Sequence, residues 1–183
     1  EYTAKPLTMV ALIGATAALD PTSENGRWCF LVALVFSLLG DVFLMLPREK
    51  LFIAGLGSFF VGHLAYIVGL RFLGFSAGGF LIAVLIVGVT VPLIGSRIIG
   101  AVRNGDDEDM AIPVTAYIAV ISIMVVSAGA TGLAIALVGA LLFYVSDALI
   151  GWTRFKSDFR GGRLAVITTY HLGQMALVAA LVA

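Results

Sequence analysis

The chain consists of long apolar runs that are separated by short polar connectors. Of its 183 residues, 61% are hydrophobic and 12% are charged, whereas soluble domains usually carry about 25% charged residues. An apolar run of roughly 17–25 residues is long enough to cross a bilayer as a helix. The runs do not alternate between apolar and polar residues, which argues against a closed barrel. The sequence therefore predicts an all-α, polytopic transmembrane helix bundle.

Seven apolar runs can be distinguished, and each predicts one helix. The connectors are short, so we expect neighbouring helices to pack antiparallel in a single domain that covers residues 1–183. Pro47 is predicted to end the second helix. Because the chain begins with Glu1 and not with Met, we expect that an N-terminal segment is missing. The predicted helices span residues 5–19, 28–46, 51–72, 77–98, 110–129, 132–152 and 163–182.

Lysine and arginine residues collect on one side of the predicted bundle. Nine of the eleven basic residues fall on connectors or helix ends of that side, and two fall on the other. By the positive-inside rule, the side with nine basic residues is predicted to face the cytoplasm. The nine are Lys5, Arg48, Lys50, Arg97, Arg103, Arg154, Lys156, Arg160 and Arg163, and the two are Arg27 and Arg71.

Two acidic residues interrupt the apolar runs. Asp41 lies in SLLGDVFLML and Asp147 in LLFYVSDALI, whereas the other nine acidic residues lie at the N-terminus or in connectors. A charged side chain near the middle of a bilayer helix costs about 2.5–3.5 kcal/mol on insertion scales. Acids inside a membrane are therefore interpreted as functional by default. The alternative is a structural role, in which serine, tyrosine or backbone groups bind the two carboxyl groups; Ser37 and Ser146 are close enough in sequence to contribute.

Several polar side chains are predicted to lie at similar depths. Asp41, Asp147 and Tyr170 lie roughly 9–10 Å from the basic side, because a helix rises about 1.5 Å per residue. Helical spacing also places polar pairs on one face of three different helices. These observations predict a polar pocket inside the bundle that opens to the cytoplasm and has an apolar lower half. The pairs are His63 and Tyr66, Tyr144 and Asp147, and Tyr170 and Gln174.

Simpler interpretations stand beside these functional ones. His63 and Gln174 are equally consistent with hydrogen bonds that hold two helices together. Tyr66 and Tyr170 lie too deep for an interfacial aromatic belt, which favours a functional role for both.

Glycine recurs at a regular spacing in the third predicted helix. Gly55, Gly62 and Gly69 are seven residues apart. Small residues let helix backbones approach closely in a membrane. The spacing therefore predicts a close helix–helix contact along this face.

Composition also excludes some classes of function. The 11 basic and 11 acidic residues leave no net charge, so there is no footprint for nucleic acid. The chain has two histidines and one cysteine, without a metal-ligand spacing and without a second cysteine for an intrachain disulfide.

Together these residues resemble the lysoplasmalogenase family, also called YhhN-like proteins. The resemblance spans nearly the whole chain, and it implies an eight-helix membrane protein, so a first helix would precede the seven seen here. One departure is Gly173, where the family pattern leads us to expect alanine. The matching segments are Lys5-Pro6, Gly40-Asp41 with Leu44-Met45, Phe60 to His63 to Tyr66, and Ser146-Asp147 with Tyr170 to Gln174.

The resemblance implies hydrolysis of the vinyl ether bond of lysoplasmalogens. The products would be a fatty aldehyde and glycerophosphoethanolamine or glycerophosphocholine. No metal ion or other cofactor is implied, and the implied partners are a lysolipid substrate and membrane lipids. We expect catalysis by Asp41, Asp147 and His63, and substrate binding by Tyr66, Tyr170, Gln174, Ser146 and Lys5.

Vinyl ethers are cleaved by acid, and two carboxyl groups suit this chemistry. Protonation of the β carbon leaves an oxocarbenium-like centre, water adds to it, and the hemiacetal collapses to aldehyde and alcohol. By analogy with glycosidases, one carboxyl group would donate the proton and the other would face the cation and the water. The sequence does not distinguish which of Asp41 and Asp147 is the donor.

A membrane transporter coupled to an ion is the main alternative, since buried carboxylates also serve as ion sites. Broken helices or an inverted repeat would support it, and the sequence shows neither. An intramembrane aspartyl protease would need a glycine three residues before Asp41, where the chain has Leu38. A zinc-dependent membrane hydrolase would need about three histidines.

Overall fold

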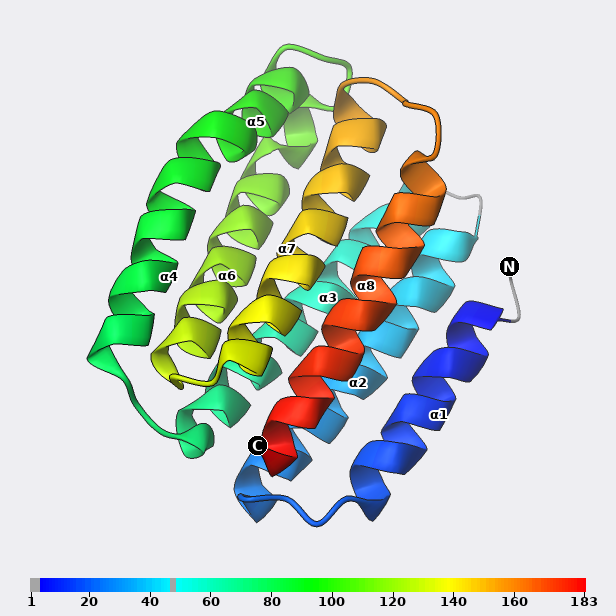
Figure 1. The fold of residues 1–183 in the computed structure, drawn as a ribbon. Coiled ribbons are helices and arrows are strands. Elements are labelled where there is room, and N and C mark those ends of the chain that lie inside the picture. The colour runs from blue at the N-terminus through cyan, green and yellow to red at the C-terminus, as the bar shows by residue number, and fades with distance from the viewer. Residues whose placement is uncertain (1–3, 47–48) are drawn as a thin grey trace.

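The computed structural model describes residues 4–46 and 49–183, and it forms a bundle of antiparallel helices (Figure 1). Within these residues the secondary structure is helical and no strand is present, which confirms the all-α prediction. All seven predicted helices are present, the fourth of them as two consecutive segments, α4 and α5. The helices are α1 Ala4–Ala18, α2 Glu24–Met45, α3 Glu49–Leu70, α4 Ala77–Thr90, α5 Ser96–Arg103, α6 Ala111–Ala130, α7 Ala134–Phe155 and α8 Gly162–Ala179.

Six helical stretches in the described residues are long and apolar enough to cross a membrane. The stretch formed by α4 and α5 counts as one of them, because it runs from Ala77 to Arg103. Helix α1 is shorter than these. The chain is therefore a multi-pass integral membrane protein.

Helix α2 begins four residues before the predicted start at residue 28. Ser23 caps it, because its hydroxyl accepts a hydrogen bond from the Gly26 N–H at 3.2 Å. Arg27, which was expected in a connector, therefore lies in the first turns of α2 and pairs with Glu24 at 2.6 Å. The predicted end of this helix at Pro47 lies outside the described residues.

The predicted end of the fourth helix at residue 98 is wrong, because the helix continues to Arg103 through a π turn. The π turn, Val91–Gly95, joins α4 to α5. Pro92 has no N–H to donate to the preceding turn, and the Ser96 N–H reaches back to the Val91 carbonyl. Such π turns are frequent near functional sites.

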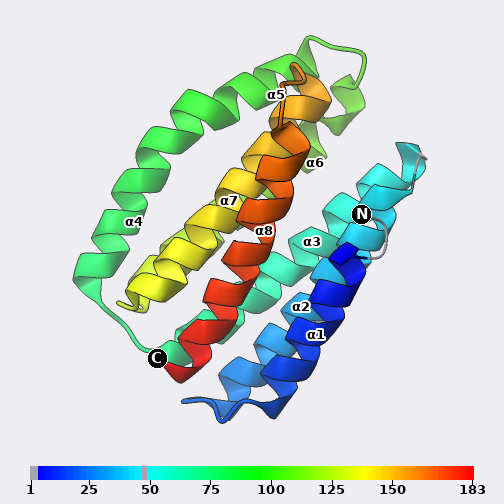
Figure 2. The same ribbon diagram turned by 45° about the vertical axis from the view of Figure 1, so that its right-hand side comes forward.

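The helices pack as neighbours in pairs. Helix α2 packs along α3, α7 along α8 and α4 along α6. Helix α3 also contacts α6, which joins the pair α2 and α3 to the pair α4 and α6. The rod of α4 and α5 lies at one edge of the bundle and α1 at the other (Figure 2). The centre of the bundle is therefore formed by α2, α3, α6, α7 and α8.

Close approaches between helices occur at glycine, as the spacing in α3 predicted. A Cβ atom at Gly55 would lie 2.8 Å from Leu44, and one at Gly69 would lie 2.7 Å from Phe30, both on α2. A Cβ atom at Gly62 would lie 3.2 Å from the backbone oxygen of Ala33, also on α2. The predicted glycine contact is confirmed, and its partner is α2.

Gly173 of α8 has a similar explanation. A Cβ atom there would lie 2.9 Å from the carbonyl oxygen of Gly139 and 2.9 Å from the backbone nitrogen of Phe143, both on α7. Alanine does not fit at this position without moving α7 away from α8. The departure from the family pattern at Gly173 therefore matches the close packing of these two helices.

The basic residues gather at the end of the bundle where α1, α3, α6 and α8 begin and where α2, α5 and α7 end (Figure 1). We call this the basic end. Arg27 and Arg71 lie near the opposite end, at the start of α2 and just after α3. Arg48 and the side chain of Lys50 lie outside what the structure describes. That the basic end faces the cytoplasm stays a prediction.

The contact between α4 and α6 is the tightest of the glycine contacts, and it gives a test of the packing. A Cβ atom at Gly79 would lie 2.1 Å from the carbonyl oxygen of Gly129, so Gly79→Ala must separate the two helices. We expect it to lower the free energy of unfolding in detergent by about 1–3 kcal/mol.

Gly88→Ala is the matched control in the same helix, because nothing lies within 4 Å of a Cβ atom at Gly88. It should be neutral or stabilising by up to roughly 1 kcal/mol, since alanine favours helix. Equal thermal unfolding curves for the two variants would contradict this account of how α4 is held.

Candidate active site

Asp147 lies on α7 and is hydrogen-bonded to two side chains from other helices. Tyr117 of α6 donates its hydroxyl proton to Asp147 Oδ2 at 2.5 Å. His63 Nε2 of α3 lies 3.3 Å from the same oxygen and 3.0 Å from the Tyr117 hydroxyl. With a proton on Nε2, the histidine N–H can be shared between these two oxygens. Three helices therefore meet at one carboxyl group.

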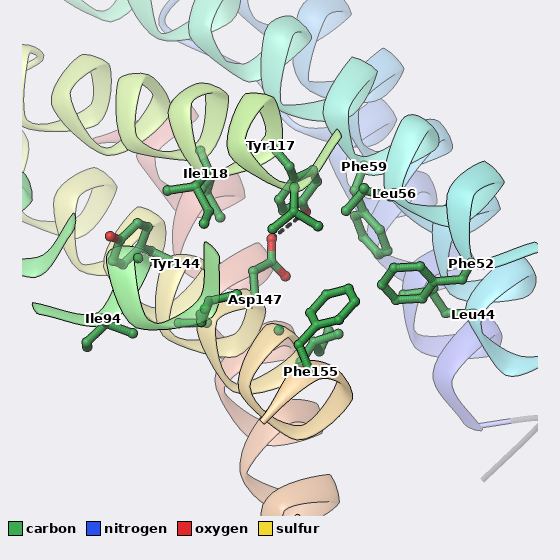
Figure 3. A pocket seen from close by; sticks show the side chains of 17 residues that line it. Leu44, Phe52, Leu56, Phe59, Ile94, Tyr117, Ile118, Tyr144, Asp147 and Phe155 are labelled. Atoms are coloured by element: carbon green, nitrogen blue, oxygen red, sulfur yellow. Dashed lines mark hydrogen bonds between the residues drawn. The ribbon is translucent and has the colours of Figure 1, made fainter. Parts of the chain in front are cut away.

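This cluster is almost completely shielded. The side chain of Asp147 is 6% exposed and that of His63 is 1% exposed. A buried carboxyl group is costly unless hydrogen bonds satisfy it, and the two described for Asp147 both end on Oδ2. The second oxygen points away from Tyr117, toward Phe155 (Figure 3).

Asp147 lines an apolar cavity of about 60 Å³ (Figure 3). The cavity lies between α2, α3, α5, α6 and α7, and the π turn contributes Ile94 and Gly95 to its wall. Its volume is sufficient for a few water molecules, and almost all of its wall is hydrocarbon. The other residues along the wall include Leu44, Phe52, Leu56, Phe59, Tyr117, Ile121, Tyr144, Ala148 and Ile150.

Asp41 belongs to a second polar cluster, between α2, α3 and α8. Tyr170 donates a hydrogen bond to Asp41 Oδ2 at 2.7 Å. One turn further along α8, the Gln174 side-chain oxygen accepts a hydrogen bond from Tyr66. Gln174 Nε2 and Ser37 Oγ are buried there without a hydrogen-bond partner in the described residues. Asp41 is not among the residues that line the apolar cavity.

The ring of Phe143 lies between the two clusters. Its centroid is 4.8 Å from that of His63 and 5.3 Å from that of Tyr170. Edge-to-face packing of this kind fixes the orientation of both neighbouring rings. The structure therefore shows two hydrogen-bonded clusters, one at each aspartate, and the Phe143 ring packs against a member of each.

Two further predicted site residues occupy different places. Ser146 is fully buried and donates a hydrogen bond to the Val166 carbonyl oxygen at 3.2 Å, which links α7 to α8. Lys5 lines a separate cavity of about 560 Å³ at the basic end. Substrate binding by these residues stays a prediction.

Tyr117 was not predicted as a site residue, although it makes the shortest hydrogen bond described for Asp147. A signal was present, because Tyr117 lies seven residues after Met110, which begins the predicted fifth helix. This places it roughly 10 Å deep, in the same layer as Asp147. Tyr144 accepts a hydrogen bond from Thr90 at 3.2 Å and also lines the cavity.

Comparison with known proteins shows one family throughout. The YhhN family model matches residues 1–181. The human protein "Lysoplasmalogenase TMEM86B" is 30% identical over 94% of this chain and 71% of its own length. "Lysoplasmalogenase" of Mycobacterium bovis is 35% identical over 81% of the chain, which spans 58% of that relative. "Uncharacterized membrane protein YhhN" of Escherichia coli is 27% identical over 97% of the chain and 85% of its own length. No solved structure matches.

The hydrogen bond between Tyr66 and Gln174 can be tested by its effect on stability. Tyr66→Phe removes the donor and leaves the fully buried amide of Gln174 without this bond. We expect the free energy of unfolding in detergent to fall by about 0.5–2 kcal/mol.

A double variant supplies the control for this measurement. In the Tyr66→Phe background, Gln174→Leu removes the unpaired amide and should recover part of the lost stability. If Tyr66→Phe unfolds at the wild-type temperature, the bond does not hold α3 against α8.

Proposed function

The chain belongs to the YhhN family, and we propose that it is a lysoplasmalogenase. The reaction would be hydrolysis of the vinyl ether bond of a lysoplasmalogen to a fatty aldehyde and glycerophosphoethanolamine or glycerophosphocholine. Relatives that carry this name support the proposal. The observation that carries it at the level of residues is Asp147, an acid at the wall of an apolar cavity.

The arrangement around Asp147 suits a proton donor. Tyr117 and His63 both contact Oδ2 and so fix the carboxyl group. Oδ1 is the oxygen that would hold the transferable proton, because it is turned away from these partners (Figure 3).

In the proposed mechanism, Asp147 in its acid form transfers its proton to the β carbon of the vinyl ether. The carboxylate that remains stabilises the oxocarbenium-like centre at the α carbon. Water then adds to this carbon, and its proton returns to Asp147, either directly or through His63. The hemiacetal collapses to the aldehyde and the glycerol hydroxyl, so Asp147 ends the cycle in its acid form.

Asp41 has a different part in this proposal. It holds Tyr170 by a hydrogen bond of 2.7 Å, and the Tyr170 ring packs on Phe143, which in turn packs on His63. Asp41 would then act as a positioning residue for the aromatic wall behind His63. This assigns the proton donor to Asp147 and a supporting role to Asp41.

The side of the membrane is also part of the proposal. Asp147 lies within nine residues of the end of α7, so it is closer to the basic end than to the opposite end. If the basic end faces the cytoplasm, as the distribution of lysine and arginine predicts, the substrate would enter from the cytoplasmic leaflet.

An ion-coupled transporter remains the alternative to an enzyme. Transporters of this kind typically contain helices that unwind near the middle of the membrane. In the described residues, the rod of α4 and α5 stays continuous through its π turn (Figure 1). This continuity favours the hydrolase.

The first test is the substitution of the proposed acid. Asp147→Asn keeps the shape of the side chain but removes the transferable proton, so turnover should fall at least about 100-fold, the usual scale of acid–base catalysis. Release of aldehyde from a purified preparation measures turnover, and a saturated ether lysolipid serves as the blank.

Asp41→Asn is the comparison for this experiment. It should reduce turnover less, by about tenfold, because Asp41 acts through Tyr170 and Phe143 in the proposal. Full activity in Asp147→Asn, or a larger loss in Asp41→Asn, would reverse or remove the assigned roles.

Filling the apolar cavity gives an independent test. Ala148 lines this cavity, and Ala148→Val adds two carbons to its wall. Stability should change little because the carbons enter existing space, whereas kcat/KM should fall at least about tenfold if the vinyl ether must lie there. A stable variant with wild-type activity would place the reaction elsewhere.

A further inference from the structure

A second cavity lies at the basic end, directly beside the apolar cavity that Asp147 lines. Its volume is about 560 Å³, and residues from α1, α2, α3, α7 and α8 form its wall. Leu44, Phe52 and Ile150 line both cavities. The second cavity and the apolar cavity are therefore adjacent and share part of one wall.

The second cavity carries more positive than negative charge. Lys5, Arg154 and Arg163 line it together with one acidic residue, Asp158. These cations come from the starts of α1 and α8 and the end of α7, so the first helix and the last two bring them together. Three basic groups beside one carboxylate suit a ligand that carries an anionic group and, attached to it, one cationic group.

Arg154 lies where the two cavities approach each other. Its guanidinium carbon is 5.5 Å from the ring centroid of Phe52 and 5.4 Å from that of Phe155, and both rings line the apolar cavity. It also forms an ion pair with Asp107 at 3.2 Å. Stacking on aromatic rings and this ion pair restrict the orientation of the guanidinium group.

We propose that this second cavity is the headgroup site of the lysolipid, in which Lys5, Arg154 and Arg163 bind the phosphodiester. The inference rests on the proposed function and extends it. In a lysoplasmalogen the phosphate, the glycerol, the vinyl ether and the hydrocarbon chain follow one another in this order. The polar cavity, the shared wall and the apolar cavity with Asp147 follow the same order along the bundle.

Asp158 completes the match to a zwitterionic headgroup. One of its carboxylate oxygens accepts the backbone N–H of Phe159 at 2.8 Å, which fixes the side chain at the cavity. A carboxylate at this place is unfavourable for an anion alone. It is favourable for an ethanolamine or choline group that is attached to the phosphate.

Arginine and lysine at a membrane surface also attract anionic lipids in general. A specific headgroup site differs from this general attraction, because it strengthens the binding of a substrate only if the substrate carries the phosphodiester. An alkenylglycerol retains the vinyl ether and lacks the phosphate. It separates the two effects within one preparation.

The test compares Arg163→Gln and Lys5→Gln with wild type on two substrates in micelles of a nonionic detergent. For an alkenyl lysophosphoethanolamine, KM should rise at least about tenfold in each variant, the usual scale of losing one charge-assisted contact. For the alkenylglycerol, KM and kcat should stay within about twofold of wild type. The matched control is Arg160→Gln, because Arg160 is exposed and does not line the cavity; it should behave as wild type on both substrates.

Three outcomes would overturn the headgroup site. One is an equal loss on both substrates, which indicates a structural role. Another is an equal effect of Arg160→Gln, which indicates general surface charge. The third is a difference between the two substrates that occurs only when anionic phosphatidylglycerol is added to the micelles.

A binding measurement separates the failure of this inference from the failure of the proposed function. A fluorescent lysophosphocholine without a vinyl ether should bind wild type at least about tenfold more tightly than Arg163→Gln. If no preparation hydrolyses a vinyl ether and this difference in binding persists, the hydrolase proposal fails while the headgroup site stands. If binding is unchanged by Arg163→Gln, the headgroup site fails, whatever the hydrolysis shows.

Discussion

The need to satisfy a carboxyl group inside the membrane organises the centre of this protein. Asp147 is buried among apolar helices, and its Oδ2 is bonded to Tyr117 of α6 and lies beside His63 of α3. Without such partners a carboxyl group in a low-dielectric interior is strongly unfavourable. The three helices must therefore keep a fixed relative position, and the same contacts leave Oδ1 turned toward the apolar cavity.

The close contacts between helices serve this arrangement. Glycines in α3 let it lie against α2, and the contact of Gly139 with Gly173 lets α7 lie against α8. Phe143, on α7, then occupies the space between His63 and Tyr170. Each membrane aspartate has its own hydrogen-bond partners, Tyr117 and His63 for Asp147 and Tyr170 for Asp41.

The two cavities differ in the chemistry of their walls, and they follow one another along the axis of the bundle. Four charged residues line the cavity at the basic end, whereas Asp147 is the one charged residue that lines the apolar cavity. A lysolipid has the same sequence of polar and apolar parts, so a single orientation of the proposed substrate would place its headgroup in one cavity and its vinyl ether in the other. The rod of α4 and α5 closes the apolar cavity from one side through its π turn.

The sequence alone determined the helical bundle, the approximate helix positions and the candidates Asp41, His63, Tyr66, Asp147, Tyr170 and Gln174. It could do so because apolar length and intramembrane charge are local properties of the chain. It did not show that Tyr117 binds Asp147, that Phe143 packs against both His63 and Tyr170, or that Ser146 binds a backbone carbonyl of α8. Only the tertiary structure decided these contacts, because the rotation of each helix about its axis depends on packing against helices that are distant in sequence.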